Sequence, residues 1–278
     1  MNDTQTTNAP RARDERDHDD VFDLFKAMAV AAVIALTIRS FLFEPFNIPS
    51  GSMFPTLLVG DYLFVEKYSY GYSTYSFPLD IVPIDGRVFE KVVTRGDVAV
   101  FRQPKRIHID YIKRIIGIPG DTIQVRGGLL YINGKPVTRE YVGAEDMSEG
   151  NAINVYQKYI ETLPGEDGKP GRKHYIYEIS DDEVNDNTEI FTVPPGHYFA
   201  MGDNRDSSLD SRIQDQVGFV PAKNLIGRAG FIFFSTEGLG DKCEYTGALA
   251  GLKKIGCWLV EGPKAVRYNR IFRGVNGF

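Results

Sequence analysis

Histidine, cysteine and tryptophan are scarce in this sequence of 278 residues, which holds four, two and one of them respectively. Two thiols cannot build a disulfide-based scaffold or a four-thiolate zinc site. Asp203, Asp206 and Asp210 are spaced somewhat like calcium ligands, but the glycine and the terminal glutamate of a calcium loop are missing. No histidine lies in a motif that indicates a Ser-His-Asp site. Those beyond the N-terminal stretch are His108, His174 and His197. The sequence therefore predicts neither a metal nor a cofactor.

An excess of basic charge is also lacking. There are 32 Lys and Arg against 37 Asp and Glu, which gives a formal net charge of −5, and no basic block occurs. This composition argues against nucleic acid as a partner. Only one long hydrophobic run is present, which excludes a protein with several membrane spans. By contrast, 28 Gly, 15 Pro, 15 Tyr and 18 Phe favour a turn-rich β protein over a helical bundle.

The single hydrophobic run follows a polar N-terminal stretch. Residues 1–20 hold almost no apolar side chain, so we predict a disordered tail there. Within residues 21–44 only Ala27–Ile38 is free of charge. However, a helix over Phe22–Phe43 would be about 33 Å long at ~1.5 Å per residue, which matches the hydrocarbon layer of a bilayer. No small-residue cleavage pattern follows it. We predict an uncleaved transmembrane anchor over 21–44, with a buried or interfacial helix as the alternative.

The distribution of Lys and Arg around this run predicts its orientation. No Lys or Arg occurs between Glu44 and Val65, whereas four basic residues lie in the tail and the first turns of the run. Basic flanks remain in the cytoplasm. The tail is therefore predicted to be cytoplasmic and the remainder of the chain to be exported.

The remainder reads as a series of short strands. Runs rich in β-branched and aromatic residues are bounded by Gly and Asp, and Asn133-Gly134 marks a hairpin. The runs are 61–68, 96–102, 111–118, 121–125, 129–132 and 231–234. No long segment after residue 45 keeps a helical period. We predict a mainly β fold, with an antiparallel catalytic core over 45–137 and 191–278, the latter including a C-terminal extension. The more polar segment 138–190 is predicted to be an inserted β-rich lobe.

A serine lies in a constrained loop directly after the anchor. Pro49 favours an extended residue before it, Gly51 allows close backbone approach, and Pro55 limits helix formation. Such a turn can present the hydroxyl of Ser52 together with its own N–H. Alone, the segment is also typical of a plain polar loop, because serine needs a base to become a nucleophile.

The best candidate for that base is a lysine. Lys113 lies in an alternating strand on which Tyr111 and Ile115 point to the same face. In apolar surroundings the charged form of an amine is disfavoured, so its pKa falls from about 10.4 and a neutral amine becomes available. Arg114 then points to the opposite face, hydrated or paired. The alternative is an ordinary lysine on a solvated strand face.

Three segments in this order resemble the family of bacterial type I signal peptidases, or leader peptidases, which are membrane-bound Ser/Lys endopeptidases. They are Pro-Ser-Gly-Ser-Met-x-Pro-Thr-Leu at 49–57, Tyr-Ile-Lys-Arg-x-x-Gly-x-Pro-Gly-Asp at 111–121 and Gly-Asp-Asn-Arg-Asp-Ser-Ser-x-Asp-Ser-Arg at 202–212. The resemblance covers roughly residues 20–235, and the run at 267–273 is similar to the family's C-terminal end. Only one anchor is visible, whereas some members have two.

The resemblance implies roles for individual residues. Ser52 would be the nucleophile and Lys113 the general base, and the Ser50 hydroxyl would form the oxyanion hole with the N–H of Ser52. The hydroxyl of Ser208 would orient the lysine. A supporting polar network would comprise Arg114, Asp210 and Arg212. The substrate-cleft wall would comprise Phe46, Ile48, Pro49, Met53, Leu57, Asp110, Tyr111 and Ile112. No cofactor is required.

The family's substrates are exported preproteins cleaved after Ala-x-Ala, bound extended against strand edges. We accordingly expect a monomer in the bacterial cytoplasmic membrane, with its catalytic domain on the periplasmic or extracytoplasmic side. The alternatives are a dedicated maturation peptidase for pilus or conjugation substrates and a non-enzymatic, membrane-tethered β assembly module. Cys243 and Cys257 could form a disulfide in an exported compartment or remain two buried free thiols.

Overall fold

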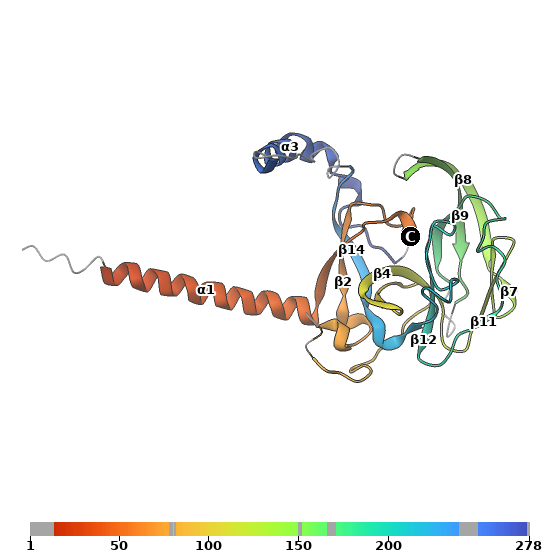
Figure 1. The fold of residues 1–278 in the computed structure, drawn as a ribbon, viewed down its shortest axis with the longest axis horizontal. Helices are drawn as coiled ribbons and strands as arrows, with labels where there is room; N and C mark the ends of the chain where they lie inside the picture. The colour runs from red at the N-terminus through yellow and green to blue at the C-terminus, as the bar shows by residue number, and fades with distance from the viewer. Residues whose placement is uncertain are drawn as a thin grey trace, which may run out of the picture.

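The computed structural model describes residues 14–77, 80, 82–149, 152–165, 171–238 and 250–276. One long helix, α1 (Asp14–Phe41), leads into a body of antiparallel strands (Figure 1). The predicted fold class, mainly β with an apolar N-terminal helix, is confirmed.

Helix α1 begins earlier and ends earlier than the sequence predicts. Residues 14–20, assigned to a disordered tail, are helical, while residues 1–13 lie outside the described part. Over Phe22–Phe41 the 20 residues have a mean hydropathy of 1.8, and the helix is long and apolar enough to cross a membrane. The helix stops at Phe41 because the chain then joins a sheet: β1 (Phe43–Asn47) begins two residues later, and the Lys67 N–H donates to the Leu42 carbonyl at 3.0 Å.

The largest sheet has seven strands in the order β1-β2-β14-β3-β4-β12-β13. Besides β1 these are β2 (Asp61–Glu66), β14 (Leu225–Ser235), β3 (Val98–Gln103), β4 (Arg106–Gly117), β12 (His197–Met201) and β13 (Val220–Pro221). Alternation sets the faces of β2: Leu63 and Val65 are buried in the main core, whereas Tyr62 and Phe64 point outward.

Two smaller sheets lie beside the first (Figure 1). One has the order β11-β5-β6-β7, comprising β11 (Phe191–Thr192), β5 (Thr122–Arg126), β6 (Leu129–Ile132) and β7 (Lys135–Pro136). Asn133 and Gly134 form the predicted hairpin turn, with positive φ angles of 52° and 74°. The other sheet has the order β10-β9-β8, comprising β10 (Lys173–Glu178), β9 (Ala152–Thr162) and β8 (Thr138–Glu149). All three strands of this last sheet fall within the segment 138–190. Residues 122–136 were predicted to belong to the same antiparallel core as 61–68 and 96–102. Their strands β5, β6 and β7 instead form a separate sheet with β11.

The C-terminal extension contains a helix that the sequence analysis missed, α3 (Ala250–Ala265). Glycines at 251, 256 and 262 together with Pro263 interrupt the apolar pattern, so no helical period stands out. Cys257 lies in this helix and is disulfide-bonded. Cys243, the predicted partner, lies outside the described residues.

Candidate active site

Ser52 lies in a single 3₁₀ turn, η1 (Gly51–Met53), that follows β1. Ser50 enters the turn with extended backbone angles, φ −135° and ψ 157°. The turn is held by the segment after β12: the Asn204 N–H donates to the Ser52 carbonyl at 3.1 Å, and Asn204 Nδ2 donates to the Gly51 carbonyl at 3.2 Å. These contacts fix the backbone around the Ser52 N–H.

Lys113 points from the middle of β4 at this turn. Its side chain is buried, and Nζ donates to Ser52 Oγ at 2.6 Å. Burial lowers the pKa of the amine from 10.5 to about 8, although the negative charges of Asp210 and Asp203 oppose the fall. A neutral amine in hydrogen-bond contact with a hydroxyl is the arrangement that general-base activation of serine requires.

Ser50 lies on the exposed side of the same turn. Its hydroxyl is 3.5 Å from Ser52 Oγ, so the two hydroxyls lie side by side at the cleft.

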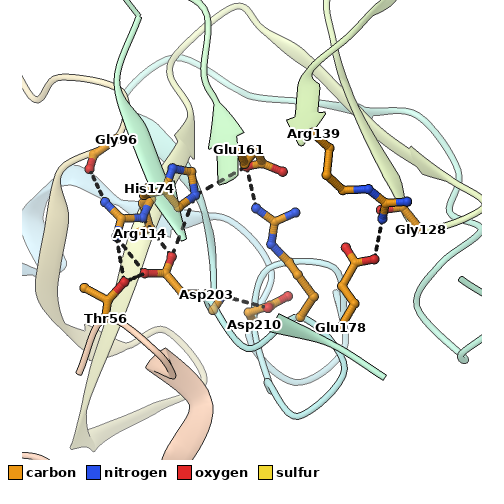
Figure 2. Close-up of polar contacts among 12 residues, drawn as sticks. Thr56, Gly96, Arg114, Gly128, Arg139, Glu161, His174, Glu178, Asp203 and Asp210 are labelled. Atoms are coloured by element: carbon orange, nitrogen blue, oxygen red, sulfur yellow. Dashed lines mark hydrogen bonds and ion pairs between the residues drawn. The ribbon is translucent and has the colours of Figure 1, made fainter. Parts of the chain in front are cut away.

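Arg114 points to the opposite face of β4, as the strand pattern predicts, but it is buried and paired. Its Nε and Nη2 donate to the two carboxylate oxygens of Asp203 at 2.7 and 2.6 Å (Figure 2). Asp203 also accepts the Thr56 hydroxyl at 2.5 Å. The spacing of Asp203, Asp206 and Asp210 suggested only a comparison with calcium ligands, and no other role was predicted for Asp203. Its place in the 202–212 motif was the signal for a structural role beside the turn that carries Ser52.

Asp210 and Arg212 form a second buried pair. Arg212 Nε donates to Asp210 Oδ1 at 3.0 Å, and Asp210 Oδ2 accepts the Gly202 N–H at 3.0 Å. Arg212 also donates to the Arg205 carbonyl. Burial alone would raise the pKa of Asp210, but Arg212 lowers it below its ordinary value. The predicted supporting network is thus two separate ion pairs, one on Asp203 and one on Asp210.

The predicted contact of Ser208 with the lysine is not formed. The Ser208 hydroxyl is buried and has no hydrogen-bond partner among the described residues. It packs against Gly202, where an added Cβ would lie 2.2 Å from Ser208 Oγ and 2.5 Å from the Ser52 carbonyl oxygen. Lys113 directs its amine to Ser52 instead.

A cleft of about 330 Å³ opens beside Ser52 and Lys113. Of the predicted wall, it is lined by Phe46, Pro49, Asp110, Tyr111 and Ile112. The assignment of Ile48, Met53 and Leu57 to the wall is wrong, because all three are at most 2% exposed and pack in the hydrophobic core with Leu63 and Val65. Sequence reasoning missed Ile109, Ser207 and Leu209, which also line the cleft. Ile109 was foreseeable from its alternation with Tyr111 on β4.

The sheet β10-β9-β8 is joined to the motif that holds the nucleophile turn. The Tyr177 N–H of β10 donates to the Asp203 carbonyl, and the Arg205 N–H donates to the Tyr177 carbonyl, both at 2.9 Å. Arg205 also donates to Glu161 of β9 at 2.5 Å, and His174 of β10 lies between Glu161 and Asp203 (Figure 2). Strands β9 and β10 of this sheet therefore hold the segment that carries Asn204.

In the part of the chain that the structure describes, no histidine is hydrogen-bonded to Ser52 or to Lys113. His174 is buried beside Arg114, and burial lowers the pKa of its imidazole. Among the described residues, no group of three or more His, Cys, Asp or Glu side chains could hold a metal ion. Within the described ranges, the titratable group hydrogen-bonded to the Ser52 hydroxyl is Lys113.

Comparison with known proteins identifies the family of this chain. The family model described as signal peptidase, peptidase S26, matches residues 21–234. Signal peptidase I of Rickettsia canadensis (strain McKiel) is 43% identical over 260 residues, which cover 90% of this chain and 92% of the relative. Signal peptidase I of Rickettsia conorii (strain ATCC VR-613 / Malish 7) is 42% identical over 257 residues, covering 90% and 91%. A crystal structure of a signal peptidase I from Enterococcus faecalis V583 is 27% identical with a TM-score of 0.28, and the match covers 50% of this chain and 97% of that one. The chain therefore belongs to the signal peptidase family, the serine peptidases of family S26.

Proposed function

We propose that Ser52 is the nucleophile and Lys113 the general base with which the enzyme removes N-terminal signal peptides from exported preproteins. The observation that carries the proposal is the 2.6 Å contact between the buried Nζ of Lys113 and Ser52 Oγ. No other described base contacts the Ser52 hydroxyl.

The reaction proceeds through an acyl-enzyme. Neutral Lys113 takes the hydroxyl proton of Ser52 as Oγ attacks the scissile carbonyl carbon. The Ser52 N–H and the Ser50 hydroxyl stabilise the resulting oxyanion, at ~3 kcal/mol per donor. The protonated amine then gives its proton to the leaving nitrogen. Once neutral again, it activates the water that hydrolyses the ester.

The free edge of β4 supports binding of an extended peptide. Among the described strands, β3 pairs with one edge of β4, whereas β12 pairs with the other only at Arg114, Ile115 and Gly117. On the edge that β12 pairs with, the stretch from Ile109 to Lys113 therefore has no strand partner among the described residues and lines the cleft. A substrate added as a strand would lay alternate side chains toward the cleft wall, where small residues such as the alanines of Ala-x-Ala fit without overpacking.

The N-terminal helix anchors the chain in a membrane. We place its N-terminus in the cytoplasm, because the basic residues precede the apolar run and none follows until after Val65. Ser52 lies nine residues after Phe43. Cleavage therefore occurs at the outer surface of the cytoplasmic membrane, where the hydrophobic segment of a signal peptide is held. One chain supplies both catalytic groups, so a monomer suffices.

A cleavage assay tests the proposal. The full chain is mixed with a preprotein carrying Ala-x-Ala, alongside Ser52→Ala and Lys113→Met variants. Lys105→Met is the matched control, since Lys105 is an exposed lysine between β3 and β4. We expect cleavage after Ala-x-Ala by the wild type and the control, and none by the two site variants. An intact substrate with the wild type, or full activity in either site variant, would overturn the assignment.

A further inference from the structure

The C-terminal half of α3 exposes three consecutive apolar side chains. Trp258, Leu259 and Val260 are 46%, 75% and 61% exposed. Moving these side chains out of water would be favourable, because burial of apolar surface lowers the free energy. Because successive side chains of an α-helix lie about 100° apart, these three residues cover rather more than half of the helix circumference, and we call the surface that they form the α3 apolar face.

The base of α3 is fixed to the largest sheet. Thr236, directly after β14, bridges to Val266. The Glu237 N–H donates to the Ala265 carbonyl, and the Arg267 N–H donates to the Ser235 carbonyl, both at 2.9 Å. The helix therefore leaves the end of β14 from a hydrogen-bonded base.

The membrane anchor is attached at the opposite end of the same strands. Phe43, two residues after the end of α1, pairs with Glu66 at the end of β2, whereas Asp61 at the start of β2 pairs with Ser235 at the end of β14. Six residues of β2 separate the two attachments by about 17 Å at ~3.3 Å per residue. In Figure 1, α1 and α3 extend from the sheet toward the same side.

A row of aromatic rings joins the two attachments on the outward face of the sheet. Phe43 contacts Phe64 at a centroid distance of 6.0 Å, and Phe64 contacts Phe231 and Phe233 at 5.5 and 4.4 Å. Tyr62 continues the row at 6.2 Å from Phe233. The row therefore runs from the end of the membrane anchor to Tyr62, which pairs with Phe234 near the end of β14.

We infer that the α3 apolar face lies in the outer interfacial layer of the same bilayer that α1 crosses. The bilayer is the one occupant whose position another described element fixes, since α1 brings it to the end of β2 from which the aromatic row begins. Tryptophan is favoured at the depth of the lipid headgroups. Lys264, one turn beyond, is exposed and forms an ion pair with Glu261 at 3.2 Å. The catalytic body would then be held to the membrane at two points, which fixes the direction of its cleft.

The chain offers its own probe of this arrangement, because Trp258 is its only tryptophan. The full chain is reconstituted in vesicles of phosphatidylcholine and phosphatidylglycerol, with bromine carried either near the headgroup end of the acyl chains or near the bilayer centre. We expect the headgroup-end bromines to reduce Trp258 emission about twofold, more than the central ones, as for an interfacial tryptophan. Aqueous acrylamide should quench it weakly. Strong quenching by acrylamide without an effect of bromine would overturn the inference, as would protection from both quenchers, which would indicate a protein surface.

A pair of variants tests the face independently of the probe. Val260→Glu places a charge on it, and Val184→Glu is the control, since Val184 is a 92% exposed valine in the loop after β10. We expect Val260→Glu to weaken bromine quenching of Trp258 and to slow cleavage of a vesicle-inserted preprotein, while a soluble peptide is cleaved at the wild-type rate. The control should leave all three unchanged. Equal quenching in the two variants would contradict the inference. The quenching requires no catalysis, so it stands or fails separately from the proposed peptidase activity.

Discussion

Lys113 should impose a steep alkaline pH dependence on catalysis. Burial lowers the pKa of its amine from 10.5 to about 8, and only the neutral form can accept the Ser52 proton. At pH 7 an amine with a pKa of about 8 is neutral in about 9% of molecules, which is about 300-fold more than an amine at 10.5. The rate should therefore rise about tenfold from pH 6 to pH 7 and level off above about pH 9.

The measurement is kcat/KM for a soluble peptide carrying Ala-x-Ala, because this parameter reports the free enzyme. Single-turnover traces at each pH establish that the chemical step limits the rate. Asp210→Asn adds an internal check, since the Asp210 carboxylate favours the charged amine of Lys113 and its loss should move the midpoint to lower pH. A flat profile, a midpoint near that of free lysine, or an upward shift in Asp210→Asn would refute the reasoning.

Three further perturbations have defined outcomes. Lys113→Met should stabilise the fold by about 3 kcal/mol below pH 8, because the native state no longer has to neutralise or bury an amine whose pKa is lowered from 10.5 to about 8. In urea titrations the increase in the free energy of unfolding should shrink as pH rises toward 10.5, because the amine of the unfolded chain becomes neutral too. An increase that grew with pH would contradict the lowered pKa of Lys113. Arg114→Met should cost about 3–5 kcal/mol by stranding the Asp203 charge, and the Arg114→Met/Asp203→Leu pair should recover most of it; no recovery would count against a buried pair. Ser50→Ala should lower kcat by about 10²-fold with little change in KM, whereas a change confined to KM would remove Ser50 from the oxyanion hole.

The sequence anticipated the meeting of Ser52 and Lys113 better than the surroundings of that contact. Alternation along β4 places Lys113 and Arg114 on opposite faces, and three short motifs indicated which loop the lysine would meet. The partner of Arg114 was not predictable from one strand, because Asp203 reaches it from a segment 89 residues away. Ion pairing of this kind depends on how the sheets pack, which no local pattern encodes.

Side-chain direction outside regular structure was the other source of error. Met53 and Leu57 were assigned to the cleft wall, yet both are completely buried in the main core, because they lie in an irregular turn where no period-two rule applies. Helix α3 was not predicted, because its glycines and Pro263 lower the helical propensity of the segment. The helix is supported instead by its attachment to the end of β14, which a local pattern does not encode.

The hydrogen bonds between Tyr177 and the Asp203–Arg205 segment make the lobe and the reaction centre a single mechanical unit. Removing residues 138–190 would leave Ser52 and Lys113 in the chain, but it would remove the strand that holds Asn204. Asn204 would then no longer fix the backbone of Ser52 through its two hydrogen bonds. A change far from the cleft would therefore lower the turnover rate.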